Sequence, residues 1–312
     1  MRTVFFGSGA FGIPCLEALV RAGHEVSLVV AQPDRERGRG RALGPPALKV
    51  AAQSLALPVF QPPRIKAPDA LEVLRPQAPE LQVVVAYGQI LPRTVIDLAP
   101  LGTVNVHASL LPRYRGAAPI QWAIANGEQV TGVTTMLIDE GLDTGPILLA
   151  ADTAIGPEET TEELEARLSR LGAEVLLRTI DGLGQGTLKA VPQDDAAASL
   201  APLIEKSDGR IDWSRPAVEI ARRVRAFHVW PGTFTTLRGR TLKVLRARPA
   251  QGAAAQGAAP GRVVAIGAGG FAVACGNGTA LEVLEVQPES RRPMTADAFL
   301  RGARLSVGAQ LD

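Results

Sequence analysis

The spacing of hydrophobic residues along the first thirty positions changes from strand-like to helical and back to strand-like. Residues 3–6 form an uninterrupted apolar run, as in a buried strand, and residues 13–22 carry apolar side chains at helical spacing as far as Gly23. Residues 24–30 are again strand-like. A strand, a helix and a second strand in this order form a βαβ unit, so the pattern predicts an α/β fold with a doubly wound parallel sheet.

Strands and helices continue to alternate through the first half of the chain. Further strands are predicted at residues 81–86, 103–107, 133–138 and 146–150. Thr160 and Glu163 have the spacing of a capping box, which predicts the start of a long helix that ends near Gly182. We therefore expect a first domain over residues 1–188.

The pattern changes after residue 188. Residues 189–204 contain an alanine-rich polar run and are interpreted as a linker. A helix is predicted at residues 216–227, followed by short strands at residues 233–237, 241–247, 262–266, 271–275 and 279–286. Short strands joined by glycine turns are typical of a small β-barrel, which we place in a second domain over residues 205–312.

The turn after the first strand has the spacing of a dinucleotide-binding fingerprint. It contains Gly7, Gly9 and Gly12, and Asp34 follows where an acid that binds a ribose would lie. Taken alone, this turn indicates an NAD(P)-dependent oxidoreductase. Asp34 stands beyond a proline rather than at the strand tip, however, and no later segment supplies a site for hydride transfer.

Charge is distributed unevenly, although the net charge is only +2. Residues 1–204 carry 17 Lys and Arg against 22 Asp and Glu, whereas residues 205–312 carry 16 against 9. A basic second half indicates a polyanionic partner, and nucleic acid is the commonest one. The hydrophobic share of 46% is typical of a globular protein.

Residues 34–49 carry four arginines at alternate positions, spaced largely by glycines and followed by two prolines. So polar a segment cannot bury a core face, and we interpret it as a loop. Guanidinium groups match the geometry of phosphate oxygens. The residues expected to bind nucleic-acid phosphates are Arg35, Arg37, Arg39 and Arg41, together with Lys206 at the start of the second domain.

The strand at residues 103–107 carries the strongest candidate chemistry. Asn105 and His107 are two residues apart, so their side chains share one face of the strand. Asp143 follows later, between two glycines that would let a ligand approach the backbone. An amide, an imidazole and a carboxylate together supply an oxyanion donor, a proton carrier and an orienting charge.

Several segments, in this order, resemble the formyltransferases that use 10-formyltetrahydrofolate. They are Gln32–Arg35 with Gly38–Gly40, Val85–Pro92, Asn105–Gln121, Gly141–Gly145 and Arg210–Trp213. The resemblance implies a Rossmann-like formyltransferase domain followed by a barrel of the oligonucleotide-binding type. Gly9 departs from the family, whose first turn usually reads Gly-Thr-Pro or similar.

The resemblance also implies a reaction, the transfer of a formyl group to the α-amino group of methionine esterified to initiator tRNA. Asn105 and a protonated His107 would stabilise the oxyanion, and the Asp143 carboxylate would favour the charged imidazole. The residues that the resemblance implies for folate binding are Ser109, Leu110, Leu111 and Pro112, with Gln89, Ile90 and Leu91.

Other functions remain open from the residues alone. The chain could formylate an amino sugar or a purine precursor, or hydrolyse the same cofactor, although neither activity needs an arginine-rich loop. It could also be a non-catalytic RNA-binding protein or the oxidoreductase described above. We expect no metal site, since no His and Cys cluster has ligand spacing.

The cellular compartment and the oligomeric state are predicted from features that the sequence lacks. Cys15 and Cys275 stand alone in apolar settings and are interpreted as core thiols. No apolar run is long enough to span a membrane, and the chain starts directly in a strand. We expect a cytoplasmic protein that is not bound to a membrane and that acts as a monomer.

Overall fold

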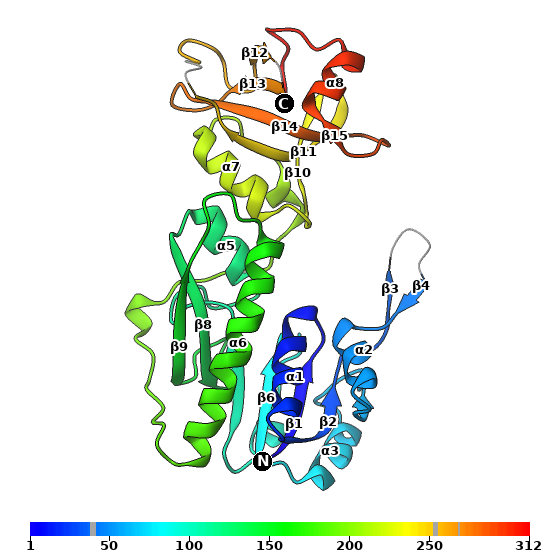
Figure 1. The fold of residues 1–312 in the computed structure, drawn as a ribbon, viewed down its shortest axis with the longest axis vertical. Coiled ribbons are helices and arrows are strands. Elements are labelled where there is room, and N and C mark those ends of the chain that lie inside the picture. The colour runs from blue at the N-terminus through cyan, green and yellow to red at the C-terminus, as the bar shows by residue number, and fades with distance from the viewer. Residues whose placement is uncertain (38–41, 252–254, 268) are drawn as a thin grey trace. The chain divides into compact units, whose positions relative to one another are not determined.

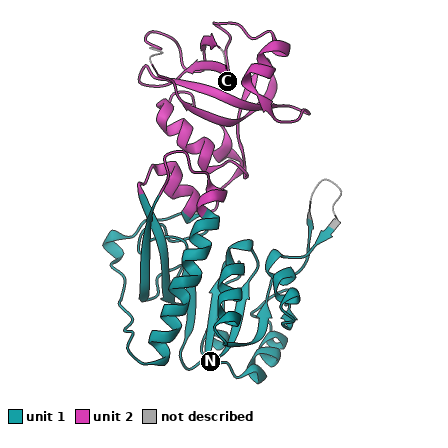
Figure 2. Cartoon of the chain, in the orientation of Figure 1, with its two compact units in different colours: residues 1–119, 130–154, 165–201 teal, residues 120–129, 155–164, 202–312 magenta. Residues whose placement is uncertain are grey.

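The computed structural model describes residues 1–37, 42–251, 255–267 and 269–312. The chain divides into two compact units (Figure 2). Unit 1 comprises residues 1–119, 130–154 and 165–201, and unit 2 comprises residues 120–129, 155–164 and 202–312. Two short segments that interrupt unit 1 along the chain therefore belong to the second unit.

Unit 1 is built on a seven-stranded sheet in the order β5-β2-β1-β6-β7-β8-β9 (Figure 1). The parallel strands are β1 (Arg2–Gly7), β2 (Glu25–Val30), β5 (Val59–Phe60), β6 (Leu81–Val85) and β7 (Thr103–His107). The antiparallel ones are β8 (Val130–Leu137) and β9 (Ile147–Ala154). The predicted α/β class is confirmed, but the sheet is mixed, because β8 returns beside β7 and forms a hairpin with β9.

Helices cover both faces of this sheet, as in a doubly wound fold. On one face lie α1 (Ile13–Arg21) and α6 (Thr161–Gly184), where a Cβ on Gly172 of α6 would lie 3.1 Å from Val106 and 3.9 Å from Cys15. On the other face α3 (Pro68–Leu74) and α4 (Arg93–Ile96) pack against apolar residues of β1, β2 and β6. The sheet core is therefore buried on both sides, which explains the continuous apolar runs.

Contacts in the structure explain two sequence features, the capping residues before α6 and the glycines of the first turn. Thr160 N donates to Glu163 Oε2 at 2.9 Å, which confirms the capping interaction before α6. The first turn continues into the short helix η1 (Ala10–Gly12). A Cβ on Gly7 would lie 2.7 Å from the carbonyl oxygen of Val85, whereas a Cβ on Gly9 would meet nothing within 4 Å. Gly7 is thus required by packing and Gly9 is not.

The prediction of a loop over residues 34–49 is wrong in part. Residues Arg35–Arg37 (β3) and Ala42–Gly44 (β4) pair as an antiparallel two-stranded sheet, and α2 (Ala47–Ser54) begins soon after. A hairpin is held by backbone hydrogen bonds and needs no buried side-chain face, so its polar composition did not exclude strands. Arg39 and Arg41 lie outside the described residues.

Unit 2 contains an antiparallel sheet in the order β10-β11-β14-β13-β12, with β15 (Met294–Thr295) beside β14. Its other strands are β10 (Thr233–Leu237), β11 (Arg240–Pro249), β12 (Val263–Gly267), β13 (Gly270–Ala274) and β14 (Ala280–Pro288). The helix α7 (Ala217–Ala226) packs Ile220 and Val224 into the core of this sheet. Ile211 and Trp213 are buried in the same core, where Trp213 Nε1 donates to Thr235 Oγ1 at 3.0 Å.

One helix of unit 2 was missed from the sequence. The helix α8 (Ala296–Ala303) begins after Thr295, whose side chain accepts a hydrogen bond from Ala298 N. Threonine at this position and an acid in the first turn were the available signals. The remaining short elements are α5 (Pro119–Asn126), η2 (Arg75–Gln77), η3 (Asp195–Ala197) and η4 (Lys206–Gly209).

The segment 308–312 joins the two outer strands of the unit 2 sheet. Leu311 forms a β-bridge with Leu237 of β10, and Gln310 forms one with Arg262 beside β12. Backbone hydrogen bonds also run from Val263 N to Ala309 O and from Thr236 N to Asp312 O. The sheet is therefore closed into a small barrel, as the short strands predicted.

Candidate active site

Strand β7 carries two of the three candidate catalytic side chains. Asn105 and His107 alternate with Val104 and Val106, which are fully or nearly fully buried. Asp143 lies in the loop between β8 and β9, where its backbone has a φ of +52°. The structure brings the three side chains together, because this loop folds onto the face of β7 that carries the amide and the imidazole.

The carboxylate of Asp143 contacts both polar side chains of β7. Asn105 Nδ2 donates to Oδ1 at 3.4 Å, and His107 Nδ1 lies 3.6 Å from Oδ2. The backbone N–H of Gly116 also donates to Oδ2, at 2.8 Å. The side chains of His107 and Asp143 are only 7% and 14% exposed. Little water therefore screens the attraction between these groups.

The other ring nitrogen of His107 is held by the main chain. His107 Nε2 lies 2.9 Å from the carbonyl oxygen of Tyr114. A carbonyl oxygen only accepts, so Nε2 carries a proton and Nδ1 is the nitrogen that faces the carboxylate. Tyr114 N donates in turn to Ser199 Oγ at 2.9 Å, which holds this carbonyl in place.

Two glycines shape the loop that carries Asp143. A Cβ on Gly145 would lie 1.7 Å from the carbonyl oxygen of Leu137, and a Cβ on Gly141 would lie 1.9 Å from Thr144 Oγ1. Neither position can hold a side chain unless the loop moves. These glycines are therefore required because the loop packs on itself.

Sequence reasoning missed the residues that support the carboxylate. Gly116 donates to it, and Gln193 Nε2 donates to the backbone carbonyls of Asp143 and Gly145 at 2.8 and 2.7 Å. Arg115 donates to the side-chain oxygen of Gln193 across 78 positions of sequence. Contacts this distant in sequence leave no local periodicity, so no signal in the sequence marked them.

The segment expected to bind folate after β7 is fastened to β8. Ser109 and Leu111 are buried, whereas Leu110 and Pro112 are partly buried. Thr134 Oγ1 donates to Ser109 O at 2.7 Å and accepts from Leu111 N at 3.1 Å. Two backbone groups of the segment that was expected to bind folate thus hold the segment itself in place.

The second segment expected to bind folate follows β6. Gln89 Oε1 accepts from Ile65 N at 2.8 Å, so this side chain fastens a neighbouring loop. Leu91 is buried in the sheet core, whereas Ile90 is 86% exposed. Ile90 is consequently the apolar side chain of this segment that is accessible to a ligand.

The residues expected to bind tRNA are only partly described. Arg35 lies in β3, where it is exposed and its Nη2 donates to Gln32 Oε1 at 3.1 Å. Arg37 ends β3, and Lys206 is exposed at the start of η4 in unit 2. The predicted contacts of Arg39 and Arg41 fall outside the described residues.

The acid of the apparent dinucleotide fingerprint is engaged in protein contacts. Lys49 Nζ lies 2.9 Å from each carboxylate oxygen of Asp34, and Gln61 Nε2 donates to the same carboxylate at 2.7 Å. A residue that binds a ribose must have its carboxylate available for the ligand. This geometry disfavours the oxidoreductase.

Both cysteines are free thiols that lie buried in the structure. Burial raises the pKa of the Cys15 and Cys275 thiols to about 12, as expected of core thiols. Among the described residues, no group of His, Cys, Asp and Glu is arranged to hold a metal ion. Of the helices that the structure describes, none is both long and apolar enough to cross a bilayer.

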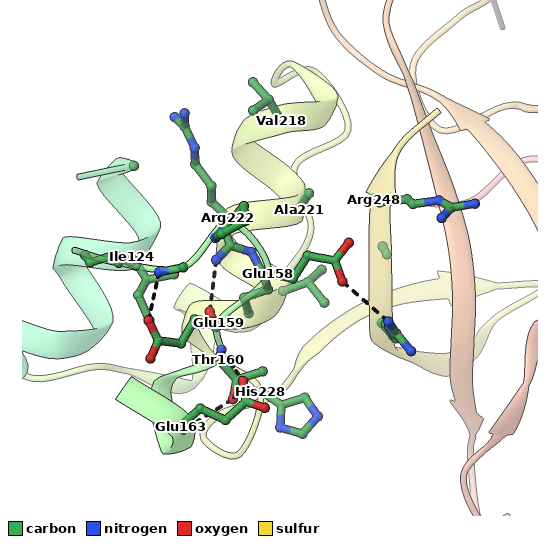
Figure 3. Close-up of a pocket in the computed structure, with 18 of the residues that line it drawn as sticks. Ile124, Glu158, Glu159, Thr160, Glu163, Val218, Ala221, Arg222, His228 and Arg248 are labelled. Atoms are coloured by element: carbon green, nitrogen blue, oxygen red, sulfur yellow. Dashed lines mark hydrogen bonds and ion pairs between the residues drawn. The ribbon is translucent and has the colours of Figure 1, made fainter. Parts of the chain in front are cut away.

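A cavity of about 870 Å³ lies within unit 2 (Figure 3). Val218, Ala221 and Arg222 line it from α7, and Arg248 lines it from β11. Glu158 and its neighbours contribute acidic groups. Acidic and basic side chains both surround the cavity, and none of the three candidate catalytic residues lines it.

Two family models cover most of the chain. The model described as formyl transferase matches residues 1–180, and the model described as formyl transferase, C-terminal domain, matches residues 203–304. The chain belongs to the formyl transferase family. The resemblance inferred from the sequence is therefore confirmed.

Two curated relatives carry a more specific name than the family and share about half of their residues with this chain. The methionyl-tRNA formyltransferase of Solibacter usitatus is 54% identical over 311 residues, which cover 100% of this chain and 98% of that protein. The methionyl-tRNA formyltransferase of Anaeromyxobacter dehalogenans is 51% identical and covers 97% of both chains. These relatives match the chain through both domains.

Solved structures share the fold at lower identity. HypX from Aquifex aeolicus in complex with tetrahydrofolic acid superposes with a TM-score of 0.65 at 19% identity, covering 96% of this chain and 47% of that one. WlaRD, a sugar 3N-formyl transferase, gives a TM-score of 0.67 at 17% identity, covering 94% of this chain and 99% of that one.

Proposed function

We propose that the protein transfers the formyl group of 10-formyltetrahydrofolate to the α-amino group of initiator methionyl-tRNA, giving N-formylmethionyl-tRNA. The observation that carries this proposal is the Asp143 carboxylate, which accepts from Asn105 and faces His107 in a poorly solvated position. The methionyl-tRNA formyltransferases that match the chain over its full length support the same substrate.

The side chains on β7 suit an attack by an amine on a formamide carbonyl. The new C–N bond forms as the carbonyl oxygen becomes an oxyanion, which needs fixed donors. One hydrogen of Asn105 Nδ2 points to Asp143, which leaves the second for this oxygen. His107 Nδ1 is the second donor, because Nε2 is held by Tyr114.

Asp143 serves the same intermediate by charge and by proton transfer. Its carboxylate stabilises a protonated His107 and takes a proton from the attacking amine, directly or through a water. The intermediate then collapses as the bond from the formyl carbon to the folate N10 breaks, and N10 takes up the proton that Asp143 accepted from the amine, which restores the carboxylate. The formyl donor would lie against the 109–112 and 89–91 segments, where Ile90 offers an exposed apolar side chain.

A comparison of acceptors tests this proposal. The purified protein is incubated with 10-formyltetrahydrofolate and methionyl-tRNA, an amino sugar or a purine precursor. We expect a formylated product with methionyl-tRNA alone. Formylation of the amino sugar or the purine precursor in place of methionyl-tRNA would contradict the assignment, and so would formate release without any acceptor.

We further propose a monomer in the cytoplasm, as the sequence suggested. The charge of the second half and the arginine-rich segment at residues 34–49 support tRNA as the partner of this chain. A molar mass of a dimer in solution, measured by light scattering, would contradict the monomer.

Replacing Arg39 with alanine should raise KM for methionyl-tRNA and leave the affinity for the folate unchanged. Phosphate contacts release counterions, so tRNA affinity falls with salt, and the loss of one contact should reduce the slope of log K against log salt by about one. The measurement is tRNA binding over a range of salt concentrations.

Arg21 provides the matched control for this prediction. It is an exposed arginine at the end of α1 whose side chain donates to Glu17 O in its own helix. The Arg21→Ala variant removes the same charge and should bind tRNA as the wild type does. Equal slopes and affinities for Arg39→Ala and Arg21→Ala would rule out a tRNA contact by Arg39.

A further inference from the structure

The side chain of Gln193 clamps the turn that carries Asp143. Its Nε2 donates to the carbonyl oxygens of Asp143 at 2.8 Å and Gly145 at 2.7 Å. Both hydrogens of the amide are thus used on one turn of backbone. Gln193 belongs to the segment that was interpreted as a linker, yet within unit 1 it reaches the loop between β8 and β9.

Arg115 fixes the orientation of this amide. Arg115 Nε and Nη2 donate to Gln193 Oε1 at 3.0 and 2.8 Å. A guanidinium can only donate, so the amide oxygen must face Arg115 and the NH₂ group must face the turn. Arg115 is itself held, because its side chain is only 8% exposed and pairs with Asp195 at 2.8 Å. Arg115 therefore determines which way the amide of Gln193 faces.

The backbone of Asp143 needs such a clamp. Its φ of +52° is unfavourable for a residue that has a side chain, and such conformations persist only where the surroundings enforce them. The carboxylate lies 3.4 Å from Asn105 Nδ2 and 3.6 Å from His107 Nδ1. The first of these distances is at the limit of hydrogen bonding and the second is an ion-pair distance, so a small shift of the turn decides whether the contacts form.

We propose that Gln193 is a positioning residue for formyl transfer, acting through the backbone of Asp143 to hold its carboxylate against Asn105 and His107. The proposal rests on the proposed function for its kinetic consequence. Arg115 and Gly116 contribute to the same arrangement from the other side, since Gly116 N donates directly to the carboxylate. The carboxylate is thus held at both its backbone and its oxygen atoms.

The substitution Gln193→Glu tests this proposal with little change of shape. The glutamate still accepts from Arg115, but it places an oxygen where the carbonyls of Asp143 and Gly145 need a donor. We expect kcat to fall by about 10- to 100-fold with KM for both substrates within about twofold, because a displaced catalytic group weakens the transition state and not substrate binding. Gln193→Ala removes the donor without adding repulsion. It should show the same fall in kcat with little change in KM.

Gln77 provides the matched control. It also lies in unit 1 and donates from Nε2 to a backbone carbonyl, that of Val73, but it is exposed and outside the site. Gln77→Glu should keep the wild-type kcat. A second test combines Gln193→Glu with Asp143→Asn, where a residue that acts through Asp143 should add little further loss. An additive loss in the double variant, or a wild-type kcat in both Gln193 variants, would overturn the proposal.

A readout without turnover separates this proposal from the proposed function. The chain has three histidines, so the ¹⁵N signals of His107 can be assigned in labelled protein. Gln193→Glu should shift them, and Gln77→Glu should not. If the wild type formylated no methionyl-tRNA, the proposed function would fail, and these signals would decide the positioning role. Unchanged signals in Gln193→Glu would overturn it.

Discussion

Replacing Asp143 with asparagine should lower kcat for formyl transfer by roughly 10²- to 10³-fold, with little change in KM for the formyl donor. Asparagine keeps the size of the side chain and an oxygen that can accept from Gly116. It removes the negative charge that faces His107 Nδ1 at 3.6 Å. That charge matters most when the imidazole is protonated beside the oxyanion, so its loss falls on the transition state. Steady-state kinetics with each substrate varied gives the two parameters.

Asp97 offers a control for the loss of a carboxylate. It is an exposed residue of unit 1 that directly follows α4 and pairs with Arg93 of that helix. Asp97→Asn should retain the wild-type kcat and the wild-type KM. Near-wild-type turnover in Asp143→Asn would remove the role assigned to its charge, while a large rise in KM with unchanged kcat would make Asp143 a binding residue.

The single substitutions Asn105→Ala and His107→Ala should each lower kcat by about 10²- to 10³-fold, and the double variant should lose little more than the worse single one. Both side chains are held by the same carboxylate and would donate to the same oxyanion. Removing either donor spoils the arrangement in which the other acts. Kinetics of the four proteins gives the coupling energy directly.

The same cycle separates two pictures of the site. If the fold-loss in kcat of the double variant equals the product of the two single losses, the amide and the imidazole act independently. The proposal that they donate to one oxyanion would then be wrong. Thermal unfolding of each variant serves as the control, because Asn105 and His107 lie on a central strand and a destabilised sheet would lower activity without any catalytic meaning. If the variants unfold at the same temperature as the wild type, the loss of kcat is a loss of catalysis and not of stability.

The sequence predicted those parts of the fold and site that leave a local pattern. Alternation along residues 103–107 placed Asn105 and His107 on one face, and the structure shows them on that face of β7. The spacing of Thr160 and Glu163 predicted the start of α6. Glycine turns predicted the strands of unit 2, because each turn and strand is determined by a few neighbouring residues.

The remaining features depend on contacts between distant segments. Gln193 was placed in a linker because its surroundings are rich in alanine and polar residues, yet its partners are Arg115 and the Asp143 turn. The β3–β4 hairpin was interpreted as a loop, since backbone pairing leaves no hydrophobic signature in a polar segment. The domain boundaries at residues 188 and 204 stay predictions.

The closure of the barrel by residues 308–312 has a consequence for colloidal behaviour. The outer strands β10 and β12 both pair with this segment, so neither offers an open row of backbone donors and acceptors along those contacts. An open strand edge is a template for pairing with another chain. A chain shortened to residue 307 should therefore form concentration-dependent aggregates, detected by light scattering, while Gln310→Ala should stay dispersed. The main role of residues 308–312 would then be to prevent self-association of the chain rather than to stabilise its fold.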